Sequence, residues 1–363
     1  MYNRFFLMAT DMEYTDCIGC IHVHFSPDGK DGDSHFFASE AEAAGLDFLF
    51  LTPHTPRRKG AIDYFSWDGY RGNVLLFAGE EVDEKSKRNH LLIWGRKQWS
   101  GRRSLDTIEE EFSHSPVFSL IAHPRGWHRL YFRKSDHRWD RPIPSFVLGM
   151  EVWSLLFDWS RYTYPLNVPV RYAGFPDNIE GPDLPTFSLW DTILAERQIT
   201  GIAGLDIHPL PFPLGLFDLK KKFSFRSVFS VLRNHVLIRG KKSMEAESDQ
   251  KAIVEGISSG RVWCANDHLA DSRNFSLRSS DGTRTLGDSF LPGETIRVHS
   301  PEKALICVKK NGIPLISSEG RELSFSPNTS GVYRVELFYR GKPWIIANPF
   351  YVSEKKGFHT GLD

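Results

Sequence analysis

The sequence has little cysteine, no long apolar run and no excess of charge of either sign. Four cysteines among 363 residues are too few for a disulfide framework. No apolar stretch approaches the roughly 20 residues that span a bilayer, and acids follow the short apolar N-terminal stretch too soon for a signal peptide. Lys plus Arg and Asp plus Glu both total 45, so no global field favours nucleic acid or an anionic membrane. These absences predict a cytoplasmic protein that binds neither nucleic acid nor membrane.

Two of the cysteines form an isolated CxxC motif, Cys17-Ile-Gly-Cys20. A zinc ribbon needs a second such pair, and the sequence contains none. We therefore expect Cys17 and Cys20 to be small residues inside a strand.

The chain is longer than one hydrophobic core usually serves, which predicts two domains. From residue 16 to about 265, short β-rich runs alternate with longer, partly helical segments, as in βα units. After about 268, short alternating runs separated by Gly, Pro, Asn and Ser turns indicate a β-sandwich. We expect one domain over residues 1–268, in which 127–190 form an elaborated loop or lid, and a β-sandwich domain over 269–363.

Seven runs of the first domain have the composition of strands: CIGCIHVH, DFLFLTPH, NVLLFAGEE, NHLLIWG, PVFSLIAHP, FVLGMEVW and ITGIAGLDIHP. Two segments have the composition of helices, SEAEAAGL and LWDTILAERQ. Ser39 is a suitable N-cap for the first of them. The pattern therefore favours an α/β fold.

Side chains able to bind a metal stand at one end of nearly every predicted strand. Alternation along a strand directs residues i and i+2 to one face, so His22 and His24 should project together. In a (β/α) barrel the C-terminal strand ends meet on one face, and imidazole with carboxylate suits Zn, Mn or Fe. The pattern predicts a metal site made of His22, His24, His54, Glu81, His90, His123, Asp206 and His208. Glu151, within the sixth strand, fits a supporting role beside that site.

These motifs resemble the polymerase-and-histidinol-phosphatase (PHP) superfamily of metal-dependent phosphoesterases. The similar segments are, in order, HVHFSPDG, DFLFLTPHT, GEEV, NHLLIWG, AHP and GLDIHP, and together they extend over residues 16–265. The segments LWDTILAERQITGIAGLDIHP and GVYRVELFYRGKPWIIANPFYV are similar to the CehA/McbA-type subgroup, in which a β-domain follows the PHP domain.

The resemblance implies a distorted (β/α)7 barrel with two or three divalent metal ions, followed by a small Ig-like sandwich. It implies one ion on His22, His24, Glu81 and Asp206, a second on Glu81, His90 and His123, and a third on His54, His208 and Asp28. The turn that carries Asp28 is shorter than the family pattern, so Asp31, Asp33 or His35 are alternatives. Pro53 stands where the family commonly has an acid, which changes the surroundings of the ligands.

Such a centre lowers the pKa of a bridging water and holds a phosphoryl group for in-line attack. The leading hypothesis is therefore a phosphoesterase acting on a small organic phosphomonoester or phosphodiester, with Glu81 and Asp206 as catalytic residues. Arg125, which follows Ala-His-Pro, is a candidate to neutralise phosphoryl charge. One alternative is carbamate or ester hydrolysis by the same centre, and another is a metal-containing binding protein without catalysis.

Overall fold

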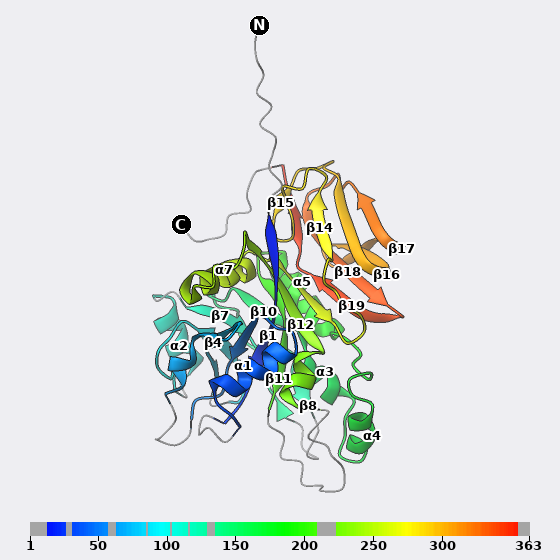
Figure 1. The fold of residues 1–363 in the computed structure, drawn as a ribbon. Helices are drawn as coiled ribbons and strands as arrows, with labels where there is room; N and C mark the ends of the chain where they lie inside the picture. Colours follow the sequence, from blue (N-terminus) through cyan, green and yellow to red (C-terminus); the bar gives the residue numbers. More distant parts are fainter. Residues whose placement is uncertain are drawn as a thin grey trace.

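The computed structural model describes residues 13–26, 31–56, 63–84, 86–101, 104–114, 117–128, 135–208 and 223–354. These residues form a mixed α/β fold that is mostly strand (Figure 1). In these ranges the helices are α1 (Ser34–Ala43), α2 (Leu105–Phe112), α3 (Leu155–Arg161), α4 (Val168–Ala173), α5 (Leu184–Leu194), α6 (Phe225–Phe229) and α7 (Ala246–Ser258), with a 3-10 turn at Tyr64–Trp67. No helix of this part of the chain is long and apolar enough to cross a membrane.

The N-terminal strands pair in a closed series. Its members are β1 (Tyr14–Val23), β2 (Phe48–Leu51), β4 (Val74–Ala78), β5 (Glu80–Val82), β6 (Leu91–Trp94), β7 (Phe118–Ile121), β10 (Gly149–Ser154) and β11 (Thr200–Ile207). β1 pairs in parallel with β2 and β11, β2 with β4, and β10 with β7 and β11. β4 continues into β5 across Gly79, and β6 joins β5 to β7. The pairings therefore lead from β1 back to β1.

All seven predicted runs contain strands of this series, and one of them is divided. NVLLFAGEE forms two strands, β4 and β5, because the strand is interrupted at Gly79. A Cβ on Gly79 would lie 2.5 Å from the carbonyl oxygen of Ile93, so only glycine allows this close approach. Beyond this interruption, a parallel bridge between His54 and Glu81 continues the pairing that β2 makes with β4.

The alternation of strand and helix is incomplete in the middle of the series. β6 is antiparallel to both neighbours, and the described residues between β5 and β6 contain no helix. A short connection suffices for antiparallel strands, whereas parallel strands need a longer crossover. The expectation of regular βα units therefore fails here.

Alternate residues of the N-terminal strands belong to two different hydrophobic clusters. On β2, Phe48 and Phe50 join one cluster with Ile253 and Ile257 of α7, whereas Leu49 and Leu51 join another with residues of α1. Burial on both faces explains why these runs are almost continuously apolar. The two cysteines of the CxxC motif follow the same rule, because Cys17 and Cys20 are buried in different clusters as free thiols. They are small strand residues, as expected.

Helix α1 begins earlier than the composition indicates. Asp33, not Ser39, is its N-cap, and the Asp33 carboxylate accepts a hydrogen bond from the Phe36 N–H at 2.9 Å. Ser39 lies inside the helix, where its hydroxyl donates to the Phe36 carbonyl. The carboxylate provides the cap six residues before the residue predicted for that role.

The C-terminal strands form antiparallel pairs, except for the parallel pair of β15 and β20, around a separate hydrophobic cluster. The remaining strands are β3 (Gly69–Arg71), β8 (Trp127–His128), β9 (Ser135–Asp136), β12 (Leu232–Arg239), β13 (Val262–Asn266), β14 (Ser276–Ser279), β15 (Ser289–Phe290), β16 (Ile296–Lys310), β17 (Ile313–Phe325), β18 (Gly331–Tyr339), β19 (Lys342–Ala347) and β20 (Phe350–Val352). The yellow to red strands β14 to β19 lie together at one side of the view (Figure 1). β13 pairs with β12 and with β19, so it joins the two sets of strands.

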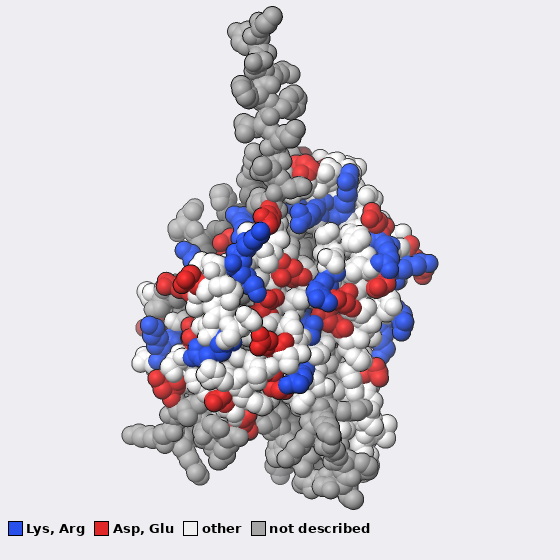
Figure 2. Space-filling model, in the orientation of Figure 1, with Lys and Arg blue, Asp and Glu red and all other residues white. Residues whose placement is uncertain are grey.

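Segment 127–190 contains regular structure. It holds β8, β9, β10, α3 and α4 and the beginning of α5. The division of the chain after residue 268, and the lid assigned to this segment, stay predictions. On the face shown in Figure 2, basic and acidic side chains are intermingled, in keeping with the equal totals of the sequence.

Candidate metal centre

Eight of the nine predicted metal ligands come together at one place. They form three overlapping groups whose donor atoms lie within 4.8 Å of one another inside each group. The groups are His22, His24, Glu81 and Asp206; Glu81, His90 and His123; and His24, His54 and His208. The ninth predicted ligand, Asp28, lies outside the described residues, so its role stays a prediction.

Glu81 stands at the centre of these groups, and its two carboxylate oxygens face different histidines. Oε2 lies 2.9 Å from His24 Nε2 and 3.3 Å from His22 Nε2. Oε1 lies 2.6 Å from His90 Nδ1 and 3.0 Å from His123 Nε2. Glu81 itself is 1% exposed. One carboxylate therefore connects two sets of imidazoles in a site shielded from water.

Asp206 lies across the cluster from Glu81. Its Oδ1 is 3.3 Å from His24 Nε2 and 3.5 Å from His22 Nε2, and its Oδ2 is 4.0 Å from His123 Nε2. β11 carries this residue to the cluster, beside β1 in the closed series. The first group thus combines two imidazoles from β1 and the residues after it with two carboxylates, one from β5 and one from β11.

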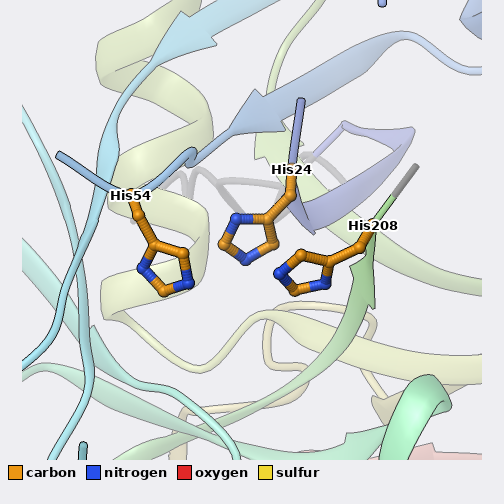
Figure 3. A group of neighbouring side chains, drawn as sticks. All are labelled: His24, His54 and His208. Atoms are coloured by element: carbon orange, nitrogen blue, oxygen red, sulfur yellow. The ribbon is translucent and has the colours of Figure 1, made fainter. Parts of the chain in front are cut away.

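The third group lies closer to solvent than the other two. Figure 3 shows His24, His54 and His208 reaching toward one another from separate segments of the chain. The side chains of His54 and His208 are 37% and 38% exposed, whereas His24 is buried. Among the described residues, His24 is the side chain that joins His54 and His208.

The three alternatives to Asp28, which are Asp31, Asp33 and His35, make other contacts or face solvent. The Asp31 carboxylate accepts a hydrogen bond from the Ser26 N–H at 2.5 Å. Asp33 caps α1, and His35 is exposed on that helix. None of the three joins a group of possible metal ligands in the part of the chain that the structure describes.

Glu151 contacts His22 at Nδ1, the ring nitrogen opposite the one that faces Glu81. Its Oε1 lies 2.5 Å from His22 Nδ1, and its Oε2 accepts a hydrogen bond from the His123 backbone N–H at 2.9 Å. A Cβ on Gly204 would lie 1.9 Å from Glu151 Oε1, so glycine is required at 204 for this carboxylate to fit. A carboxylate on the outer nitrogen of a histidine fixes the ring and directs the inner nitrogen to the site.

The charges of the cluster shift the pKa values of its members. Burial raises the pKa of Glu81, but His22, His54 and His90 outweigh it and hold that pKa well below its ordinary value. Burial lowers the pKa of His22, but Glu151 and Glu81 raise it well above its ordinary value. Partial burial lowers the pKa of His208, and the charge of His24 acts in the same direction.

The donor atoms fit divalent metal ions. His22 Nε2 and His24 Nε2 lie 2.9 Å apart and both face Glu81 Oε2. Two imidazole nitrogens and a carboxylate oxygen directed at one point are the ligand types that Zn, Mn and Fe take. Six of the eight residues are also buried, so their polar atoms cannot be satisfied by bulk water.

Arg125 lies beside the cluster rather than in it. It lines a cavity together with His123 and Glu151, and its buried Nε has no hydrogen-bond partner in the described structure. The position is consistent with the prediction that Arg125 meets negative charge near His123.

Two further histidines lie near the centre and were not predicted as site residues. The His137 ring is 5.4 Å from that of His90 and 5.9 Å from that of His123, and it stacks on His128 at 5.8 Å. His128 ends β8 and His137 directly follows β9, and no predicted strand marks either of them. Only their place after the fifth predicted strand links them to the site.

The fold and the site together define a mixed α/β protein with a buried histidine and carboxylate cluster that could bind divalent metals. No family model and no curated protein matches the chain. A solved structure of a two-domain protein from Bacteroides vulgatus, which contains a predicted PHP-like metal-dependent phosphoesterase, is similar with a TM-score of 0.43 and 15% identity. The match covers 96% of this chain and 99% of that one. At this degree of similarity the comparison assigns no function, and the site geometry has to carry the proposal.

Proposed function

We propose that the chain is a metal-dependent hydrolase that cleaves a small organic phosphomonoester or phosphodiester. His22, His24, Glu81 and Asp206 would hold one ion, and Glu81, His90 and His123 a second. His54 and His208 would hold a third with His24 or Asp28. In this proposal the chain is a member of the PHP superfamily, of the CehA/McbA type, and Zn, Mn or Fe are the ions.

The same proposal includes the fold. The closed series of strands that begins and ends at β1 supports a distorted (β/α)7 barrel. The separate hydrophobic cluster of the C-terminal strands supports an Ig-like sandwich over residues 269–363.

The observation that carries the proposal is the position of Glu81 between two sets of histidines. A carboxylate that offers one oxygen to each set is suited to bridge two cations. When bound, two ions of this kind lower the pKa of a coordinated water and neutralise charge on a phosphoryl group.

The residues of the chain have distinct tasks in such a reaction. Glu81 and Asp206 supply negative charge that keeps the ligands in place, and Glu151 orients His22. Arg125 would donate hydrogen bonds to phosphoryl oxygens as their charge grows. Its guanidinium favours an anionic substrate, which supports a phosphoester over a neutral carbamate.

Elemental analysis of the purified protein tests the metal assignment. We expect two or three equivalents of Zn, Mn or Fe per chain and hydrolysis of members of a panel of phosphomonoesters and phosphodiesters. Glu81→Gln should lose metal and reduce kcat/KM by about a thousand-fold or more, because the carboxylate between the two sets is gone.

Glu80→Gln is a matched control for that variant. Glu80 lies on the same strand and is also 1% exposed, but its carboxylate contacts Thr55 and the Ser100 N–H and belongs to none of the three ligand groups. It should keep the metal content of the wild type. Full activity with unchanged metal in Glu81→Gln would reject the proposed function, and cleavage of carbamates alone would replace it by the alternative hydrolase.

A further inference from the structure

Two arginines line a cavity that adjoins the metal centre. Arg125 and Arg161 border it together with Ser154, and it reaches His123 and Glu151. Of the eight described candidate ligands, only His123 lines this cavity. A group bound in it would therefore lie next to the centre without displacing the ligands.

Neither arginine has an acidic partner in the described structure. Arg125 Nε is buried without a hydrogen bond, and the Arg161 guanidinium lies 5.8 Å from the ring of Tyr162. The nearby Asp158 carboxylate feels the charge of Arg161. Its hydrogen bonds, however, come from the Trp153 indole and two backbone N–H groups.

The two carboxylates that line the cavity are engaged elsewhere. Glu151 is held by His22 and by the His123 N–H. Asp183 is the N-cap of α5 and accepts from the Thr186 N–H at 3.1 Å. The cavity therefore offers two unpaired guanidinium groups and no carboxylate free of other bonds.

A hydroxyl completes this set of donors. Ser154 precedes α3, but its side chain does not cap that helix. Its Oγ is buried and has no hydrogen-bond partner in the described part of the chain. Guanidinium groups and a hydroxyl are the donors that bind carboxylate and phosphate oxygens.

We propose that this cavity binds an oxyanion, a carboxylate or a phosphate, carried by the part of the substrate that does not react. The assignment of this anion to a substrate rests on the proposed function. The pocket then selects phosphoesters that have a second acidic group, and Arg161 is its specificity-determining residue, since it lies on the pocket and outside the ligand cluster.

Calorimetric titration of the metal-loaded protein with sulfate tests the pocket without any assay of activity. We expect Arg161→Gln to bind sulfate about ten-fold more weakly than the wild type, and Arg161→Lys to recover part of the loss. Arg226→Gln is the control, because Arg226 is an exposed residue of α6 paired with Glu40. It should bind sulfate within about two-fold of the wild type.

Unchanged affinity in Arg161→Gln, or no binding of sulfate by the wild type, would overturn the pocket. Thermal unfolding followed by circular dichroism establishes that each variant is folded. If Arg161→Gln is not, the same titration with Ser154→Ala decides the question, because Ser154 lines the cavity and has no part in the proposed reaction.

A pair of substrates tests whether the anion belongs to the substrate. The wild type should have a KM about ten-fold lower for 4-carboxyphenyl phosphate than for its neutral carbamoyl analogue, and Arg161→Gln should lose this preference. Loss of sulfate binding without any preference in the wild type would overturn the assignment to the substrate in favour of a free anion. If neither compound nor phenyl phosphate is hydrolysed, the proposed function fails, whereas the titration still decides the pocket.

Discussion

Three candidate ligands hold backbone angles that side chains with a Cβ rarely adopt. The φ angles are 68° at His22, 26° at His123 and 49° at Asp206. Such conformations cost energy and persist where surrounding contacts fix them, often at functional sites. The register of β1 shifts between Ile21 and Val23. His22 and His24 therefore lie close together because the strand is irregular at this point. The regular alternation of side chains, on which the prediction was based, is not the reason.

Gly204→Ala should damage the centre without touching a ligand. The new methyl group would collide with Glu151 Oε1, so the carboxylate has to leave His22. We expect the affinity for metal to fall about 10–100-fold, as for the loss of other partners of ligand histidines. Titration of the metal-free protein with Zn or Mn measures the change.

Gly320→Ala is the matched control for Gly204→Ala. A Cβ on Gly320 would meet its nearest neighbour at 3.6 Å, an ordinary contact. This variant should bind metal as the wild type does. If Gly204→Ala also kept the wild-type affinity, Glu151 would have no part in orienting His22.

His235 gives the stability of the fold a dependence on pH. This fully buried imidazole lies 2.8 Å from an Asp16 oxygen and 3.1 Å from an Asp267 oxygen, and it stacks on Trp263. Burial lowers its pKa, but the two carboxylates outweigh burial and raise it to about 9. The folded state therefore holds a proton that the unfolded state releases near its ordinary pKa of 6.5.

We expect this proton to contribute on the order of 3 kcal/mol below pH 6.5, and the contribution to disappear as the pH rises through about 9. Urea unfolding at pH 6, 7.5 and 9.5 measures the effect. His235→Gln should flatten the dependence over that range. His114→Gln should leave it intact, since His114 is exposed at the end of α2. Equal slopes for the wild type and His235→Gln would contradict the prediction.

At the scale of elements, the sequence predicted the strands correctly where an apolar run is followed by a candidate metal ligand. A run such as DFLFLTPH marks a strand because both of its faces are buried, and His54 follows where the run stops. The partners of β6 could not be predicted, because an apolar run carries no information on strand direction. His137 was missed for a related reason, since it belongs to a connection without periodicity.

Arg334 fastens α5 to β18 and illustrates a contact that no local pattern reveals. It is 2% exposed, lies 4.6 Å from the Trp190 ring, donates to Glu336 at 3.0 Å and forms an ion pair with Asp191. Glu336 comes from the same strand, whereas Asp191 and Trp190 come from α5, more than a hundred residues earlier.

Arg334→Gln should destabilise the protein by about 2 kcal/mol, because the buried Glu336 keeps only Lys309 as a cation and the half-buried Asp191 loses its partner. Denaturant unfolding measures the loss. Arg321→Gln removes an exposed arginine paired with Glu302 and should cost less than about 1 kcal/mol. Similar values for the two variants would show that the contact between α5 and β18 adds little.

At the scale of the whole molecule, the two predicted domains share a strand contact. β13 pairs with β19, and Trp263 of β13 is buried in the C-terminal hydrophobic cluster. A chain that ends at residue 268 would expose Trp263 and one edge of β13. The change in composition near 268 marks the start of the β-rich region, but it carries no information on how firmly the two parts are joined.

We therefore expect residues 1–268, expressed alone, to lack a cooperative thermal transition at the temperature of the full chain. The transition can be measured by heating both proteins and following the far-ultraviolet circular dichroism and the near-ultraviolet signal of the buried tryptophans. Trp263→Phe in the full chain keeps the backbone pairing and should lower the transition by only a few degrees. A fragment as stable as the full chain would show that the first domain folds independently.

The closed series of strands also fixes the order in which the centre can arise. His22 and Asp206 lie on β1 and β11, which are 184 residues apart along the chain and become neighbours only when the series closes. Pairings of such sequence separation form late and slowly, because the loop between them has to be ordered first. The site formed by His22, His24, Glu81 and Asp206 would thus be completed only in a late step of folding, and a chain still being synthesised could not assemble these four residues until β11 had emerged.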